Sequence, residues 1–507
     1  MTQTQTIALV ALGLFTLLMV FVGFYGATKN KSLADFILGG RAVGPWISAF
    51  SYGTSYFSAV VFIGYAGMHG WNIGIGALWI GIGNALIGCL AAWLLLAKRT
   101  RSMTHKLCSS TMPNFFEKRY KSTSLKIYSA IIIFVFLVPY AASVYKGLGA
   151  LFGTIFPGVS ENICMLLVAV LTAIYLVLGG YIATSLNDFI QGIIMFFGII
   201  AMLITIFRFD SVGGISGWYS QLTDISTQNN LTLTSIFGGS SLRFLCVNIL
   251  LTSLGCFGLP QMIHKFYAIK NEASIKQATI ISTLFSLFIG CGAYLVGTMG
   301  RILVPASADG TPACGYDNVV PNILNTVFSS GTFASIVLSV VLLLLLSASM
   351  STLASVVLTS SSAISIDLVL TAKPKMKQTS QMVLMRILCL SFVALSYIFA
   401  TMNISFIVNL MSFSWGIVAG SFIGPYVWGL YSKKITKAAA WVGTLSGLAV
   451  VLAGIIAITA VNGFNTAKSF APELGVAAIF TSLISVPVVS LFTKKFDNKH
   501  TLEIFED

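Results

Sequence analysis

Apolar segments long enough to cross a bilayer recur along the whole chain. A membrane-spanning helix needs about 20 apolar residues, and about thirteen segments reach that length. Because a backbone inside lipid must satisfy its own hydrogen bonds, such segments fold as helices. We therefore expect an all-α polytopic membrane protein with about 13 transmembrane helices. The segments cover residues 6–28, 46–68, 74–97, 127–156, 162–181, 186–207, 237–263, 277–302, 327–365, 382–401, 405–431, 439–461 and 475–493.

The scarcity of charge excludes a soluble protein. Only 9% of the 507 residues are charged, against about 25% in an ordinary soluble domain. The sequence also contains no arrangement of catalytic Ser, His and Asp residues, no cluster of metal ligands and no phosphate-binding loop. We therefore expect neither an enzyme nor an organic cofactor.

The net charge of +14 is explained by where the basic residues lie. If the N-terminus is outside, the loops that hold most of them all face inward, and cytoplasmic loops are enriched in Lys and Arg. We expect a multi-pass protein of the plasma (inner) membrane with a cytoplasmic C-terminus and no nucleic-acid partner. The basic loops lie at residues 29–41, 98–126, 265–276, 373–377 and 433–437, and Lys265 is assigned to the third of them.

Two apolar segments contain an interruption. Residues 48–58 (SAFSYGTSYFS) bring many hydroxyl groups and Gly53 to bilayer depth, and residues 253–260 (SLGCFGLP) end in a proline that removes a helix hydrogen bond. Helix–helix contacts through Ser and Thr, or a simple proline kink, are the alternatives. The two interruptions begin two halves of five helices each, and this placement predicts a transporter binding site between them.

A third polar stretch, residues 347–355 (SASMSTLAS), lies in the ninth segment. Ser351 and Thr352 are adjacent, so both hydroxyl groups can flank one point, and hydrogen bonding back along the helix can turn the Ala348 carbonyl outward. Oxygen ligands without formal charge suit Na⁺, as they suit other hard cations. Close packing of small residues is the alternative reading.

The placement of the acidic residues favours Na⁺ over a proton as the coupling ion. No carboxylate is expected near the centre of a span, because Asp188 is placed at the inner edge of the sixth and Asp367 at the inner end of the ninth. Proton-coupled carriers usually rely on buried acids or His. Lys146, in the outer half of the fourth span, either neutralises a substrate carboxylate, or extends toward the headgroups or has a structural role.

Several motifs in the expected order resemble the sodium/solute symporter family, over essentially the whole chain. The motifs are residues 39–45, 175–183 (YLVLGGYIA), 187–192, 257–260, 350–353 and 429–443. The resemblance implies a LeuT-like core of two inverted five-helix repeats within one transporter domain, residues 1–507. It places an extra helix at 6–28, the repeats at 46–207 and 237–431, two further helices at 439–493 and a cytoplasmic tail at 494–507.

The resemblance also implies residues for the ion. The carbonyl groups of Thr54, Phe57 and Ala348 and the hydroxyl groups of Ser351 and Thr352 would bind Na⁺. Asp188 would help Na⁺ leave toward the cytoplasm.

The substrate positions match the family less closely. Proline carriers have an Asp where this chain has Tyr56 and aromatic residues where it has Thr252 and Cys256, which argues against proline. Residues 258–260 are closer to pantothenate-type members, and a small organic acid or zwitterion is expected. The candidate substrate residues are Ser55, Tyr56, Ser58, Asn84, Tyr140, Lys146, Thr252, Cys256, Gly258, Leu259 and Gln261.

These expectations combine into Na⁺-coupled symport of a pantothenate-, amino-acid- or sialic-acid-like solute into the cell by alternating access. The expected partners are the solute, Na⁺ and the lipid bilayer, and the expected assembly is a monomer. The alternatives are a proton-coupled symporter of a similar solute, a sugar-type Na⁺ symporter, and a membrane sensor or channel with the same fold.

Overall fold

The computed structural model describes residues 3–30, 32–156, 158–328, 331–402, 404, 406–496, 500 and 504–505. Within these ranges every regular element is helical, which confirms the all-α expectation. Most of the predicted tail after residue 496 lies outside the described residues.

Eleven helices in the described part of the chain are long and apolar enough to cross a membrane. Two of them are 47 residues long, about twice what one crossing needs, so each makes two crossings. The eleven are Gln3–Lys29, Val60–Lys106, Thr123–Ile155, Glu161–Phe207, Gly239–Ala268, Glu272–Leu303, Thr332–Ala372, Gln378–Thr401, Ile407–Tyr431, Lys437–Asn462 and Ala471–Phe492.

Each double-length helix reverses at a glycine. In Val60–Lys106 the turn is at Gly74, whose φ is 61°, and in α9 (Glu161–Phe207) it is at Gly180, whose φ is 53°. Positive φ is strained for residues that carry a Cβ atom. With the two reversals counted, the described chain makes the expected thirteen crossings.

Most of the crossings are single long helices, and the shorter helices belong to the crossing segment Val60–Lys106 (α4, α5 and α6), end a crossing segment (α14 and α17) or lie between the crossings. The long ones are α1 (Gln3–Lys29), α8 (Thr123–Ile155), α13 (Glu272–Thr298), α16 (Thr332–Ser362), α18 (Gln378–Thr401), α19 (Ile407–Tyr431), α20 (Lys437–Asn462) and α22 (Ala471–Phe492). The shorter ones are α2 (Leu33–Leu38), α4 (Ala66–Ile73), α5 (Leu78–Gly83), α6 (Lys98–Lys106), α7 (Met112–Tyr120), α10 (Gly214–Gln228), α14 (Gly300–Leu303), α15 (Val319–Val327), α17 (Leu370–Ala372) and α21 (Phe464–Ser469).

The two predicted interruptions are present. Helix α3 (Pro45–Tyr56) ends where Phe57 turns to an extended conformation, and helical structure resumes at η2 (Val60–Tyr65). Helix α11 (Leu242–Gly255) is separated by a short turn from α12 (Pro260–Ala268). Proline at the first position of α12 costs no hydrogen bond there, because the N–H it lacks has no helical partner.

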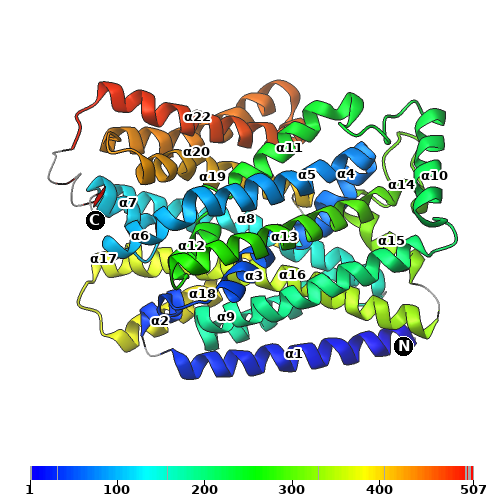
Figure 1. The fold of residues 1–507 in the computed structure, drawn as a ribbon, viewed down its shortest axis with the longest axis horizontal. Helices are drawn as coiled ribbons and strands as arrows, with labels where there is room; N and C mark the ends of the chain where they lie inside the picture. Colours follow the sequence, from blue (N-terminus) through cyan, green and yellow to red (C-terminus); the bar gives the residue numbers. More distant parts are fainter. Residues whose placement is uncertain are drawn as a thin grey trace.

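The ends of the bundle differ in charge. At one end, called here the basic end, Arg101 donates to the Lys270 carbonyl and Arg119 to the Ser432 carbonyl. In Figure 1 this end, with α2, α6, α7 and α17, is at the left, and the opposite end, with α10, α14 and α15, is at the right.

Burial separates the core from the lipid-facing helices. Helix α19 is almost entirely buried, whereas α1 and α20 present apolar side chains such as Phe21 and Ile456 to the outside. In Figure 1, α1 forms one edge of the bundle and α20 and α22 form the other. The apolar outer faces are what a helix bundle in lipid requires.

The assignment of Lys265 to a loop is wrong. It lies within α12 with 2% of its surface exposed. Apolar residues on both sides, including Ile263 and Phe266, continue the helix into the bundle, and the lysine is carried inward with them.

The backbones of α4 and α13 lie in close contact at Gly70, so a larger residue at this position should destabilise the protein. A Cβ atom on Gly70 would overlap the backbone of Gly297, and overpacking costs about 1–3 kcal/mol. We expect Gly70→Ala to lower the thermal unfolding midpoint of the purified protein. Gly13→Ala in α1, where nothing lies within 4 Å of the added carbon, is the control and should leave the midpoint unchanged. Equal midpoints for the two variants would contradict this packing.

Candidate cation and solute site

Two hydroxyl groups of α16 meet the carbonyl groups at the end of α3. Ser351 Oγ lies 2.8 Å from the Thr54 carbonyl oxygen and 3.1 Å from that of Ala348. Thr352 Oγ1 lies 3.1 Å from the carbonyl oxygens of both Ser55 and Ala348. These five oxygens, all from buried residues, are called the oxygen cluster below.

The cluster exists because α3 ends early. The last carbonyl groups of a helix have no helical donor, and Thr54 and Ser55 are within the last turn of α3. In a buried position such carbonyls need other donors. Ser351 and Thr352 supply them from residues nearly 300 positions further along the chain.

The structure brings together four of the predicted ion ligands: Thr54, Ala348, Ser351 and Thr352. The Phe57 carbonyl accepts no hydrogen bond from the two α16 hydroxyl groups, and the Ser55 carbonyl takes that place. Neutral hydroxyl and carbonyl oxygens at one point fit a hard monovalent cation such as Na⁺.

Asp188 belongs to a neighbouring group rather than to the oxygen cluster. Its Oδ2 accepts hydrogen bonds from Ser51 Oγ and Lys265 Nζ. Its Oδ1 has no partner among the described residues, and the side chain is fully buried. Both partners lie far from Asp188 in the chain, so its position at the inner edge of the sixth predicted span did not indicate them.

Four predicted solute residues form one hydrogen-bonded group. Tyr56 donates to the Thr252 carbonyl at 3.0 Å, and Cys256 lies 3.6 Å from the same oxygen. The Thr252 hydroxyl lies 2.7 Å from Asn84 Oδ1, which Ser253 also approaches. This group joins the break in α3 to the end of α11.

A second polar group lies on the other side of the Tyr56 ring. Trp415 of α19 stacks on Tyr56 and meets Tyr140 of α8 edge-on, with ring centroids 6.3 and 5.6 Å apart. The Trp415 indole nitrogen and the Tyr140 hydroxyl donate no hydrogen bond to any described residue. Ser58 and Thr352 lie near that hydroxyl, so the Tyr140 hydroxyl lies beside the oxygen cluster, with the Trp415 ring packed against the Tyr140 ring.

The remaining predicted solute residues are placed differently. Gly258 packs against the α19 backbone, where a Cβ atom would approach the Ala419 carbonyl. Leu259 is the buried residue that precedes α12, and Gln261 is buried with Oε1 unpartnered. Only Gln261 of these three offers a free polar atom.

Lys146 forms an ion pair at the opposite end from the basic loops. Its Nζ lies 3.7 Å from Asp317 Oδ2, and the carboxylate also accepts from the backbone N–H of Ile407 at the start of α19. Burial raises the pKa of Asp317, and Lys146 opposes that shift. The pairing is of the kind expected from the structural reading of Lys146, whereas the binding of a substrate carboxylate stays a prediction.

Two buried residues near the site, Lys265 and Trp415, were not predicted, although the sequence around each is unusual. Lys265 lies between Ile263 and Phe266 in a largely apolar stretch, next to His264, which is unusual for a loop lysine. Trp415 follows Ser412 and Ser414 in an apolar segment. Neither of these local patterns predicts which residues the side chain contacts.

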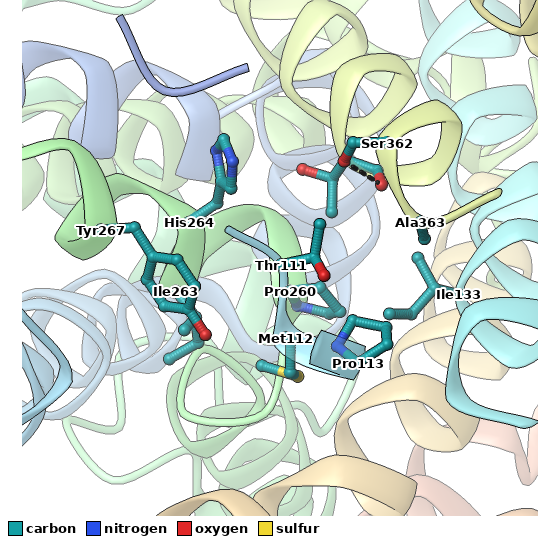
Figure 2. Close-up of a pocket in the computed structure, with 11 residues that line it drawn as sticks. Thr111, Met112, Pro113, Ile133, Pro260, Ile263, His264, Tyr267, Ser362 and Ala363 are labelled. Atoms are coloured by element: carbon teal, nitrogen blue, oxygen red, sulfur yellow. Dashed lines mark hydrogen bonds between the residues drawn. The ribbon is translucent and has the colours of Figure 1, made fainter. Parts of the chain in front are cut away.

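A small cavity lies beside α12, on the side of the α11–α12 interruption that faces the basic end. Its volume is about 10 Å³, room for roughly one water molecule. Figure 2 shows residues of α12, α7 and α16 around it, among them Pro260, His264, Thr111 and Ser362.

Known proteins resemble this chain along nearly its whole length. The profile of the sodium:solute symporter family matches residues 36–447. The osmoregulated proline transporter OpuE of Bacillus subtilis is 29% identical, covering 96% of this chain and 95% of its own. The sodium/proline symporter of Staphylococcus aureus is 30% identical, covering 97% and 93%. The solved structure of a Na⁺-coupled sialic acid symporter superposes with a TM-score of 0.76 at 18% identity, covering 97% and 99%.

The fold, the oxygen cluster and these similarities define a Na⁺-coupled secondary transporter with a LeuT-like core, not an enzyme. The chain belongs to the sodium:solute symporter family.

The Lys146–Asp317 pair predicts an asymmetric response to mutation. Lys146→Met leaves a carboxylate buried without its charged partner, a loss on the order of 2 kcal/mol in unfolding free energy. Lys146→Met with Asp317→Asn should recover most of that loss and retain the wild-type KM for solute. A raised KM in a stable double variant would instead support a solute-binding lysine.

An exposed ion pair is the control for the Lys146 and Asp317 variants. Arg243 and Glu473 lie 3.8 Å apart, with the arginine side chain 75% exposed. Exposed pairs contribute little, so Arg243→Ala should leave the thermal unfolding midpoint near that of the wild type.

Proposed function

We propose that the protein imports a small organic acid or zwitterion together with Na⁺ by alternating access. The observation that carries this proposal is the adjacency of the oxygen cluster to the Tyr140 hydroxyl, beside the Trp415 ring and its unpartnered indole nitrogen, at the break in α3. One point then offers oxygens for a cation and donors for a carboxylate.

The geometry supports a coupling mechanism. A cation in the oxygen cluster takes the place of the hydroxyl hydrogen bonds and holds the end of α3 against α16. Tyr56 and Ser58 flank the same break, so the ion also orders the residues that face the solute. Coupling of this kind is a difference in solute affinity between states with and without the ion.

The direction of transport follows from the charge of the two ends. Lys and Arg are enriched on the cytoplasmic side, so the basic end faces the cytoplasm and the N-terminus lies outside.

The solute class rests on the residues at the site. Two uncharged donors and no described acid next to Trp415 favour a carboxylate-bearing solute. The relatives are named as proline carriers, whereas Tyr56, Thr252 and Cys256 depart from the proline pattern. A thermal-shift screen of the purified protein against acids, amino acids and sugars, with Na⁺ present, separates these solutes.

Proton coupling is the second candidate, and one observation favours it. Asp188 and Asp367 are fully buried carboxylates, and proton-coupled carriers usually rely on buried acids. Replacing Na⁺ with choline at fixed pH abolishes uptake by a Na⁺ symporter and leaves uptake by a proton symporter intact.

The repeat architecture and the oligomeric state are part of the proposal. The inverted repeats span residues 46–207 and 237–431, between an extra N-terminal helix and two C-terminal helices. The transport unit is a monomer.

The oxygen cluster predicts a specific loss of Na⁺ affinity. Ser351→Ala and Thr352→Ala each remove one oxygen, and a hydrogen bond or ligand to a charged group contributes about 1.5–3 kcal/mol. We expect the Na⁺ concentration for half-maximal uptake into proteoliposomes to rise roughly tenfold to a hundredfold.

Ser339→Ala is the matched control for these variants. Ser339 is buried on the same helix and bonds only to the Ser335 carbonyl, one turn away. Wild-type uptake that is indifferent to a Na⁺ gradient would overturn the proposed coupling.

The two unpartnered donors predict the solute contact. Trp415→Phe and Tyr140→Phe each remove a donor and keep an aromatic ring, so we expect a KM for solute roughly tenfold higher with little change in stability. Tyr145→Phe, on the same helix but beside Ser396 of α18, is the control. A KM that is unchanged in both donor variants would place the solute elsewhere.

A further inference from the structure

A groove lies at the basic end between elements that are far apart in the chain. Its walls come from α2, from the segment around α17 and from the start of α18, and its volume is about 490 Å³. In Figure 1, α2 and α17 both lie at this end. Sites for small molecules have volumes of about 300–1,000 Å³. The groove shares no lining residue with the oxygen cluster or with the small cavity beside α12, so it is a separate feature of the molecule.

The groove has an amphipathic lining. Apolar side chains come from α2 and from the end of the α16 crossing, and hydroxyl and amide groups come from three separate segments. Apolar patches rimmed by polar residues mark protein or membrane interaction sites. The apolar residues are Leu33, Ile37, Ile366 and Leu370, and the polar ones are Ser32, Ser110, Gln378 and Gln381.

Positive charge gathers beside the groove. A neighbouring hollow of about 530 Å³ is lined by Lys373, Lys375 and Met376 among others, and Met376 also lines the groove. Lys377, the residue before α18, is exposed. Asp35 of α2 accepts a hydrogen bond at 2.8 Å from Ser32, which caps the same helix. Three lysines against this one carboxylate leave the surroundings of the groove positive.

Arg386 presents a further basic group near the same end. It lies in the α18 crossing, eight residues after Gln378, and its Nε is buried without a partner among the described residues. Side chains on a helix lean toward its N-terminus, which for α18 is at the basic end. Basic side chains placed in this way extend toward the headgroups.

We propose that this groove binds one anionic phospholipid of the inner leaflet, with its phosphate at the lysines of residues 373–377 and an acyl chain along the apolar wall. The cytoplasmic leaflet carries anionic lipids, and basic pockets between membrane helices on that side bind their headgroups. This inference goes beyond the proposed function and takes from it only the orientation, with the basic end in the cytoplasm.

The groove adjoins a hydrogen bond that ties α7 to the end of the α16 crossing. Ile366 directly precedes Asp367, and Ser110 directly precedes Thr111, whose hydroxyl lies 2.7 Å from Asp367 Oδ2. Asp367 is in a π-helical turn, Ala363–Val369, and such turns are frequent at functional sites. A lipid that binds beside this bond stabilises the arrangement of the basic end, because a ligand stabilises the state to which it binds.

The test measures binding of phosphatidylglycerol to the purified protein by native mass spectrometry, with phosphatidylcholine as the zwitterionic comparison. We expect the wild type to bind one phosphatidylglycerol in preference to phosphatidylcholine. Lys373→Gln with Lys375→Gln and Lys377→Gln should weaken this binding roughly a hundredfold, because each lysine near an anionic lipid contributes about a factor of five. The three lysines are exposed, so the variant should keep the wild-type unfolding midpoint in phosphatidylcholine.

A second triple variant is the matched control. Lys433→Gln with Lys434→Gln and Lys437→Gln removes the same charge from exposed positions in another basic loop. Its affinity for phosphatidylglycerol should stay close to that of the wild type. Equal losses in the two triple variants would show a general attraction to the basic end and contradict a site in the groove.

The wild-type protein separates a lipid site from a site for soluble phosphates. Glycerol 3-phosphate carries the same phosphate without acyl chains, so it should fail to displace the lipid, whereas phosphatidylglycerol should raise the unfolding midpoint. Displacement by glycerol 3-phosphate, or binding of phosphatidylcholine as tight as that of phosphatidylglycerol, would overturn the inference.

Discussion

The carbonyl groups released by the break in α3 are the constraint on which the centre of the molecule depends. Lipid and packed side chains offer them no water, so another part of the chain must supply donors. Ser351 and Thr352 do so from α16. The same oxygens are those that a hard cation would take. The contact that stabilises the break is therefore also the contact that an ion can replace.

A similar argument applies to the buried charges. Asp188 and Lys265 are each costly to bury alone, and they lie together with Ser51 and Ser355 at the junction of α3, α9, α12 and α16. Both interrupted helices contribute to this junction. Movement of either helix relative to α16 must break these charged hydrogen bonds.

At the end of the bundle opposite the basic end, Lys146 is paired with Asp317. Because this lysine is neutralised there, it adds no unpaired charge to the proposed solute site. Near the oxygen cluster lies the neutral hydroxyl of Tyr140, with the Trp415 ring packed against the Tyr140 ring. Neutral donors beside a bound cation can recognise a carboxylate without an opposing fixed charge in the protein.

The sequence by itself determined the thirteen crossings, the two breaks and the positions of Ser351 and Thr352, because apolar length, proline and glycine act through the local backbone. Tertiary structure alone decided the partners: Ser55 in place of Phe57 at the oxygen cluster, and Asp188 for Lys265. These pairs join residues far apart in the chain. Which helix faces meet depends on the packing of the whole bundle, so a local sequence pattern cannot predict these pairs.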